Sequence, residues 1–358
     1  NAEAFRAHAD RLTPAATIPM HTPGEAIEEL EYAVKVLGLK AIMLESNIRR
    51  PITAPPKDTP ALSRAGGTFW IDPLALDSEY DYDPVWRKCI ELKVAPTTHS
   101  GTQGWPNRSS ISSYVYNHIG HFAAAGEVLC KALFLGGVTR RFPQLRFAFL
   151  EGGVGWGVML YHDLISHWEK RNYQALKAHL DPASVDRDLL VELVRRHGDE
   201  RQCSKVDELR RGDGYYRDPV VERDEDLDEW KSCRISEARD VRDLFVPNFY
   251  FGCEADDHMV AWAFNDKVNR FGAKINAMFS SDIGHWDVPD ATAVVAESYE
   301  LVEHGHITPD DYRDFVFGNA VTLRADMNPD FFRGTAVEDA VDRLMAARPS
   351  LAAVAAAE

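Results

Sequence analysis

Short apolar segments, each followed by a stretch with helical spacing, recur six times along this chain. Parallel strands need a long crossover connection, and a helix usually supplies it, so this alternation predicts an α/β fold with a parallel sheet. The predicted strands cover residues 15–20, 39–44, 94–98, 145–150, 249–252 and 276–280. The predicted helices include residues 122–135, 158–168, 259–271 and 291–303.

Two architectures use this repeat. A (β/α)8 TIM barrel needs eight strand–helix units, whereas an open doubly wound sheet would be complete with six. We expect a (β/α)8 barrel, in which the six strands are the third to the eighth. The first strand or strands would then lie outside this chain. Residues Ala4–Leu12 agree with that interpretation, because they read as the tail of a helix.

The predicted organisation is one TIM-barrel domain over residues 1–335 and a C-terminal helix or tail over residues 336–358. A charged helical insertion over about 170–246 separates the sixth and seventh barrel strands, and it contains the acidic run Glu222–Glu229. This segment is either a solvated insertion or a lid over the site, because insertions on the catalytic face of a barrel cover the pocket.

The net charge argues against two classes of partner, and the cysteines indicate the cellular compartment. The net charge of -16 argues against binding to nucleic acid or to an anionic membrane surface, since both require a basic face. The five cysteines are widely spaced, which favours reduced thiols in a cytoplasmic protein. We therefore expect a small-molecule substrate as the partner, and a homo-oligomeric state is left open.

Three predicted strands end beside a residue suited to metal binding or proton transfer, namely His99, Glu151 and Asp282. In a barrel, the carboxyl ends of the strands meet on one face, so these side chains should lie close together. His99 and Asp282 are the candidate metal ligands, and Asp282, Glu151 and His285 are the candidate catalytic residues. The alternatives are a loop-anchoring role for His99, Glu151 or His285, and an N-cap role for Asp282.

Four further residues are candidates for substrate binding. His118 and His121 are three positions apart and share a face if the stretch is helical, which favours a pocket wall over a metal site. Trp105 and Arg108, and Arg49 besides, are candidates for holding a substrate ring or carboxylate. The alternative for Trp105, Arg108 and Arg49 is an ordinary surface position.

The motifs taken together resemble a known family. A strand followed by His-x-Gly, then F-P-x-L-x-F-x-F-x-E-G-G, then S-D-x-x-H resembles the amidohydrolase-related (amidohydrolase 2) family of (β/α)8 barrels. The branch that it resembles contains aminocarboxymuconate semialdehyde decarboxylase and the non-oxidative aromatic acid decarboxylases, and residues 136–145 are very like that branch. The likeness runs from about Leu12 to Asn328.

The resemblance implies roles for the strand-end residues. His99 and Asp282 match metal-ligand positions of the family. Glu151 stands where many members carry a histidine, so it is a metal ligand, a general base or a residue that holds the loop. The family's first strand supplies an H-x-H metal pair, and this sequence contains no such motif.

The expected function follows from the resemblance. It is a metal-dependent decarboxylase or hydrolase that acts on a small carboxylate or aromatic substrate, with a single divalent ion as cofactor, zinc first and manganese as the alternative. The second hypothesis is a catalytically inactive barrel that serves as a binding or scaffold protein. Substitution of His99 or Asp282 by Ala separates the two, because only an enzyme loses turnover.

Overall fold

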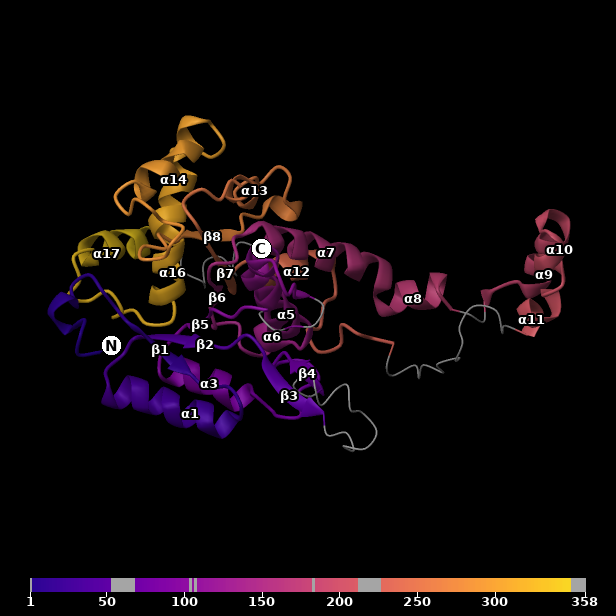
Figure 1. Ribbon diagram of the computed structural model, residues 1–358, viewed down its shortest axis with the longest axis horizontal. Coiled ribbons are helices and arrows are strands. Elements are labelled where there is room, and N and C mark those ends of the chain that lie inside the picture. The colour runs from indigo at the N-terminus through magenta and orange to yellow at the C-terminus, as the bar shows by residue number, and fades with distance from the viewer. Residues whose placement is uncertain are drawn as a thin grey trace. The chain divides into compact units, whose positions relative to one another are not determined.

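The computed structural model describes residues 2–52, 68–102, 105, 108–181, 184–211 and 227–348 (Figure 1). The chain divides into two compact units. The first consists of Asn1–Leu164 together with Ser232–Glu358, and the second is Ile165–Lys231.

The first unit contains a six-stranded parallel sheet (Figure 1). The strands follow one another in sequence order, without the reversal that defines a doubly wound sheet, so the doubly wound alternative is wrong. The predicted α/β class and all six predicted strands are confirmed. Among the described residues, no pairing joins β8 back to β1. The strands are β1 (Ala15–Ile18), β2 (Ala41–Leu44), β5 (Pro96–Thr98), β6 (Phe147–Phe149), β7 (Phe249–Cys253) and β8 (Asn276–Phe279).

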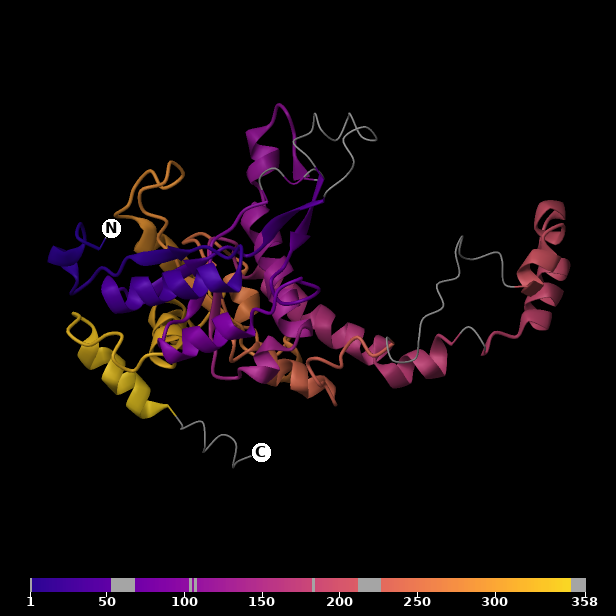
Figure 2. The same ribbon diagram turned by 90° about the horizontal axis from the view of Figure 1, so that it is seen from below.

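Helices separate the strands, as the alternating pattern predicts. The first helix, α1 (Pro23–Glu31), begins after Thr22, whose side chain accepts a hydrogen bond from the Glu25 amide. Pro23 occupies its first helical position. The helix packs against α3 (Figure 2). The helices of this unit include α1 (Pro23–Glu31), α3 (Asp83–Glu91), α4 (Tyr114–His118), α5 (His121–Leu135), α6 (Val138–Arg141), α7 (Gly155–Arg171), α12 (Ala238–Phe245), α13 (Val260–Ala263), α14 (Val294–Glu303), α15 (Pro309–Arg313), α16 (Asn319–Ala325) and α17 (Glu338–Ala347).

Aromatic side chains from neighbouring strands form the centre of the core. Phe149 of β6 and Phe251 of β7 stack with ring centroids 5.8 Å apart, and Phe245 of α12 lies 5.0 Å from Phe249. Every residue of β6 and β7 is buried. Such pairs add to the free energy gained from burial, so they fix the register of the two strands and hence the position of the loops beyond them.

The structure contains a two-stranded antiparallel hairpin that the sequence pattern does not predict. It consists of β3 (Ile48–Ile52) and β4 (Thr68–Asp72). The first strand does alternate, but Arg50 occupies a buried position and Pro51 follows it, so the usual apolar pattern is missing.

A buried ion pair explains why an arginine is tolerated there. The Arg50 guanidinium donates to Asp72 at 2.9 Å, to the Tyr82 hydroxyl at 2.9 Å and to the His21 carbonyl at 2.7 Å. Tyr82 in turn donates to the Met20 carbonyl at 2.6 Å. A buried charge is stable only when it is paired and hydrogen-bonded in this way, and the network ties the hairpin to the segment that follows β1.

Two predicted helices are wrong. The stretch 259–271 forms only the short α13 and, after turns, the 3-10 helix η6 (Arg270–Gly272), in which Phe271 has a φ of 60°. Asn269 donates to the carbonyls of Trp262 and Ala263, and such side-chain bonds compete with continued helix. The predicted helix tail Ala4–Leu12 contains only a 3-10 turn, Arg6–His8.

The second unit lies between β6 and β7 in the sequence and is helical. Three of its helices begin at side-chain caps, which Asn172, Asp186 and Asp199 provide. Asp186, for example, accepts a hydrogen bond from the Leu189 amide at 2.9 Å. Besides the end of α7 it contains α8 (Tyr173–His179), α9 (Arg187–His197), α10 (Glu200–Cys203) and α11 (Val206–Arg211). Residues 222–226 of the acidic run and 349–358 of the tail lie outside the described residues. Within the described part of the chain, no helix is both long and apolar enough to cross a membrane.

Candidate functional site

The three predicted strand-end residues do follow strands of the same sheet. His99 follows β5 directly, Glu151 comes two residues after β6, and Asp282 comes three residues after β8. Because these strands are parallel, their carboxyl ends lie at one edge of the sheet. That edge is where ligands bind in both barrels and open α/β sheets.

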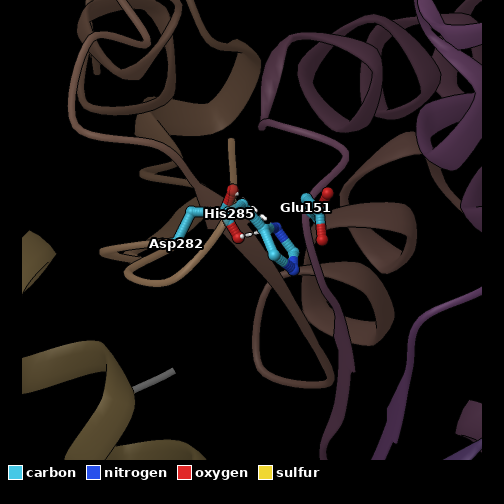
Figure 3. A group of neighbouring side chains, drawn as sticks. All are labelled: Glu151, Asp282 and His285. Atoms are coloured by element: carbon cyan, nitrogen blue, oxygen red, sulfur yellow. Dashed lines mark hydrogen bonds and ion pairs between the residues drawn. The ribbon is translucent and has the colours of Figure 1, made fainter. Parts of the chain in front are cut away.

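Glu151, Asp282 and His285 form a compact group there. One ligand atom from each residue lies within 4.8 Å of the other two. Figure 3 shows the His285 ring beside the Asp282 carboxylate, with Glu151 on the other side of the ring. The Nδ1 atom of His285 lies 2.7 Å from Oδ1 of Asp282, and this hydrogen bond and the charge of Asp282 raise the pKa of His285.

This donor set suits a divalent metal ion. Zinc and manganese both accept carboxylate oxygen and imidazole nitrogen as ligands. Asp282 and Glu151 are largely shielded from solvent, whereas His285 is exposed. Carboxylates held this close together repel one another unless a cation or proton lies between them, so the group fits a metal ion.

His99 does not belong to this group, although sequence reasoning paired it with Asp282. Its Nε2 atom contacts the Glu151 carboxylate, and its ring lies edge-on to Phe122 at 4.6 Å. Glu151 therefore meets His99 as well as the Asp282–His285 pair. His99 is placed to orient Glu151, a role that partners of metal ligands commonly have.

The backbone turns sharply at two of these residues. Glu151 has a φ of 58° and Asp282 a φ of 47°, in the left-handed region that side chains other than glycine rarely adopt. Each such residue costs about 1–3 kcal/mol, and such strain concentrates at functional sites. The strain at both positions agrees with a functional role for these two carboxylates.

A cavity of about 520 Å³ adjoins Glu151. Among the residues that the structure describes, five carboxylates line it and no lysine or arginine does. Its walls come from the α4–α5 turn, the start of α7 and the loops after β6, β7 and β8. The lining residues are His118, Ile119, Gly120, His121, Phe122, Ala123, Glu151, Gly152, Gly153, Gly155, Trp156, Glu254, Asp256, Asp257, Met259 and Asp287. We call it the acidic cavity.

His118 and His121 both line the acidic cavity, although they do not share one helix. His118 ends α4, Gly120 adopts a left-handed φ of 68°, and His121 begins α5. The two rings still lie 4.9 Å apart. His121 is buried, and neither of its ring nitrogens has a hydrogen-bond partner among the described residues. Burial and the neighbouring His118 lower the pKa of His121, so its ring is neutral near pH 7.

Trp105 and Arg108 lie outside the lining of this cavity. Arg108 donates to the carbonyls of Ile119 and Gly120 at 3.3 Å, and its own amide donates to the Trp105 carbonyl at 3.0 Å. These bonds give Arg108 a role in holding the turn between α4 and α5.

A second cavity, of about 410 Å³, lies on the other side of the His99–Glu151 contact. It carries a guanidinium and a single carboxylate, and we call it the mixed cavity. Its lining residues are His21, Glu45, Asn47, Ile48, Arg49, His99, Ser100 and Gly101. His21 and Glu45 follow β1 and β2. Sequence reasoning missed both, although their positions at strand ends were a usable signal.

Glu254 was also missed, although it directly follows β7. Partial burial, together with repulsion from Asp256, Asp282, Asp287 and Glu151, raises the pKa of Glu254 to about 7. Because its side chain is still exposed to solvent, we give the repulsion more weight than the burial. The pKa of Glu254 thus reports the negative field of the acidic cavity.

Three solved structures have folds similar to that of this chain. An amidohydrolase from Mycobacterium avium subsp. paratuberculosis K-10 is 17% identical, with a TM-score of 0.45 over 86% of this chain and 57% of its own. A 2,6-dihydroxybenzoate decarboxylase from Rhizobium is 18% identical, with a TM-score of 0.49 over 92% of this chain and 75% of its own. A dihydroxybenzoic acid decarboxylase from Polaromonas sp. JS666, solved with bound manganese, is 17% identical, with a TM-score of 0.46 over 90% of this chain and 71% of its own.

This chain thus spans little more than half the length of the first of these proteins. The sequence profile of the amidohydrolase family matches residues 1–203. Since that match covers 203 of the 358 residues, this chain belongs to the amidohydrolase family.

Proposed function

We propose that this chain is a metal-dependent enzyme that decarboxylates or hydrolyses a small carboxylate or aromatic substrate. The observation that carries the proposal is the grouping of Glu151, Asp282 and His285 beside the acidic cavity. Membership of the amidohydrolase family supports the reaction class. The sequence resemblance to aromatic acid decarboxylases favours decarboxylation, and hydrolysis is the alternative.

Glu151, Asp282 and His285 would hold the metal, with zinc or manganese as the ion. A bound divalent ion supplies Lewis acidity toward a substrate oxygen. His99 contacts Glu151 and keeps that carboxylate oriented. His118, His121 and Phe122 form the wall against which a substrate ring would pack.

His285 has two competing roles. Asp282 occupies its Nδ1 atom, so Nε2 is either a metal ligand or a proton donor. Asp282 raises the pKa of His285 and so favours the protonated ring, which can deliver a proton to a substrate carbon or leaving group. The metal content of His285→Gln separates these roles, because a proton donor can be removed without loss of the metal.

The test is turnover by the purified full chain loaded with Zn²⁺ or Mn²⁺. Hydroxybenzoates report decarboxylation through released carbon dioxide, and aromatic esters and amides report hydrolysis. We expect turnover that is lost with a chelator and in Asp282→Asn, and kept in Asp310→Asn, which makes the same change at an exposed position on α15.

Turnover that survives both the chelator and Asp282→Asn would contradict a metal-dependent mechanism. A chain that binds neither ion and converts no substrate of either class would instead support the inactive binding barrel.

A further inference from the structure

The acidic cavity has the opposite charge from the one that a purely anionic substrate requires. Its lining includes Glu151, Glu254, Asp256, Asp257 and Asp287, and the described part of the lining contains no lysine or arginine to balance them. A carboxylate ligand that entered there without a cation would be repelled. The charge of this cavity therefore selects for positive charge on whatever occupies it.

The carboxylates do not all serve the same purpose. Glu151 belongs to the candidate metal group. Asp257 accepts hydrogen bonds from the amides of Met259 at 2.9 Å and Val154 at 3.4 Å, so it holds the loop after β7 against the start of α7. Glu254, Asp256 and Asp287 remain as carboxylates available to a ligand.

The spacing of these three disfavours a second metal ion. Within the part of the chain that the structure describes, Glu151, Asp282 and His285 form the group whose ligand atoms lie close enough to share an ion. Glu254, Asp256 and Asp287 do not join it or form another such group. Negative charge spread over a wider wall suits a larger organic cation.

Aromatic and apolar side chains complete the wall. Phe122, Trp156 and Met259 line the same cavity. The face of an aromatic ring attracts a cation, and a cavity that shields the pair from water strengthens the attraction. The wall thus combines negative charge with surfaces that hold an apolar body.

Two buried polar groups in this wall have no partner. His121 is only 4% exposed, and both of its ring nitrogens lack a hydrogen bond. The indole nitrogen of Trp156, which is 9% exposed, also lacks a partner. Unpaired buried polar atoms are costly, so the acceptor nitrogen of the neutral His121 ring indicates a ligand that donates a hydrogen bond to it. The indole N–H of Trp156 only donates, so an ammonium group would not satisfy it.

We propose that the acidic cavity binds the protonated amino group of a small ligand with an aromatic or apolar body. The ammonium group donates to Glu254 and Asp256 and to the neutral imidazole of His121, while the body packs on Phe122 and Trp156. The inference rests on the proposed function only in identifying this ligand as the substrate, which would then be an amino-substituted acid.

The test compares three probes of similar size, benzylamine, benzyl alcohol and benzoate, by ligand-observed NMR titration of the full chain in mildly alkaline buffer with a chelator. We expect benzylamine to bind most tightly. Glu254→Gln and Asp256→Asn should each weaken benzylamine binding about fivefold and leave benzyl alcohol unchanged, the size expected for one nearby charge in a solvated site.

The control is Glu28→Gln, the same change at an exposed position on α1, which should leave all three affinities unchanged. It separates the local field from the overall charge of -16. Circular dichroism confirms that each variant is folded.

Benzylamine that binds no better than benzyl alcohol would overturn the proposal. The proposal would also be overturned if Glu28→Gln weakened benzylamine binding as much as the cavity variants do. It would be overturned as well if both cavity variants bound benzylamine with wild-type affinity. Selective amine binding without metal-dependent turnover would retain this inference and refute the proposed function. Metal-dependent turnover without amine selectivity would do the reverse.

Discussion

The two cavities beside the strand ends differ in charge and in construction. The acidic cavity is lined by five carboxylates on loops after β6, β7 and β8, whereas the mixed cavity carries Arg49 and a single carboxylate, Glu45. The mixed cavity is also braced by the buried Arg50–Asp72 pair beside it. The difference shows that one edge of a sheet can present two chemically distinct walls.

The His99–Glu151 contact connects them. His99 lines the mixed cavity, and Glu151 lines the acidic one. A ligand with groups of opposite charge would therefore find complementary walls on the two sides of this contact. We place the candidate metal with the acidic side, because Glu151 belongs to the metal group and His99 does not.

The largest expected effect on metal affinity and turnover tests that placement. Glu151→Gln should lower metal affinity and turnover by at least about 100-fold. His99→Gln should lower them by about 10- to 100-fold, because this is the usual loss when a residue that only orients a metal ligand is replaced. Metal titration and turnover of the two variants give the ranking. A larger loss in His99→Gln than in Glu151→Gln would move the metal to the mixed cavity.

The next effect concerns the stability of the fold beside the mixed cavity. Arg50→Met should lower the free energy of unfolding by about 3–5 kcal/mol, because it leaves Asp72 buried without its cation. The matched control is Arg333→Met, which breaks an exposed pair with Asp330 and should cost about 0–1 kcal/mol. Urea denaturation measures both. Equal losses would show that the buried pair does not brace the mixed cavity.

Gly101 provides a way to disturb one cavity from the other. It lines the mixed cavity, and a Cβ atom at this position would lie 2.4 Å from Nδ1 of His121, which lines the acidic cavity. Gly101→Ala should destabilise the fold by about 1–3 kcal/mol and displace the His121 ring. Urea denaturation and benzylamine binding check the two effects. A variant unchanged in both would mean that the cavities are independent.

The smallest effect is a pH dependence of stability. The pKa of Glu254 lies near 7, above its ordinary value of 4.5, so the folded state holds this proton more tightly than the unfolded state. Its stabilising contribution is full below about pH 4.5 and is lost as the pH rises through 7. Glu254→Gln should therefore be more stable than wild type near pH 8, by about 1 kcal/mol after solvent screening.

Urea denaturation of the metal-free chain at about pH 5 and pH 8 measures this difference. Glu28→Gln is again the control and should follow the wild type. If the free energy of unfolding changed with pH in the same way in the wild type and in Glu254→Gln, the carboxylates of the acidic cavity would not raise the pKa of Glu254.

The sequence predicts the parts of the fold that depend on short-range pattern. All six sheet strands follow from apolar runs, and the strand-end rule singles out His99, Glu151 and Asp282. The structure groups Glu151 and Asp282 with His285 of the same loop and leaves His99 out of that group. The meeting of His118 and His121 is anticipated from their spacing, even though Gly120 divides the stretch into two helices.

What the sequence does not predict depends on long-range pairing. The β3–β4 hairpin is hidden because its buried position holds Arg50, whose partner Asp72 lies 22 residues away. The interrupted helix after Met259 is set by side-chain bonds from Asn269. The field at Glu254 arises from carboxylates on separate loops, so no local pattern predicts it.

The most direct test of the account is anomalous diffraction from crystals of the full chain soaked with Mn²⁺ or Zn²⁺. We predict one strong peak within ligand distance of Glu151 and Asp282, and no such peak in crystals of Asp282→Asn. A peak that His99 ligates without Asp282 or Glu151, or no peak in the wild type, would contradict the proposed metal centre.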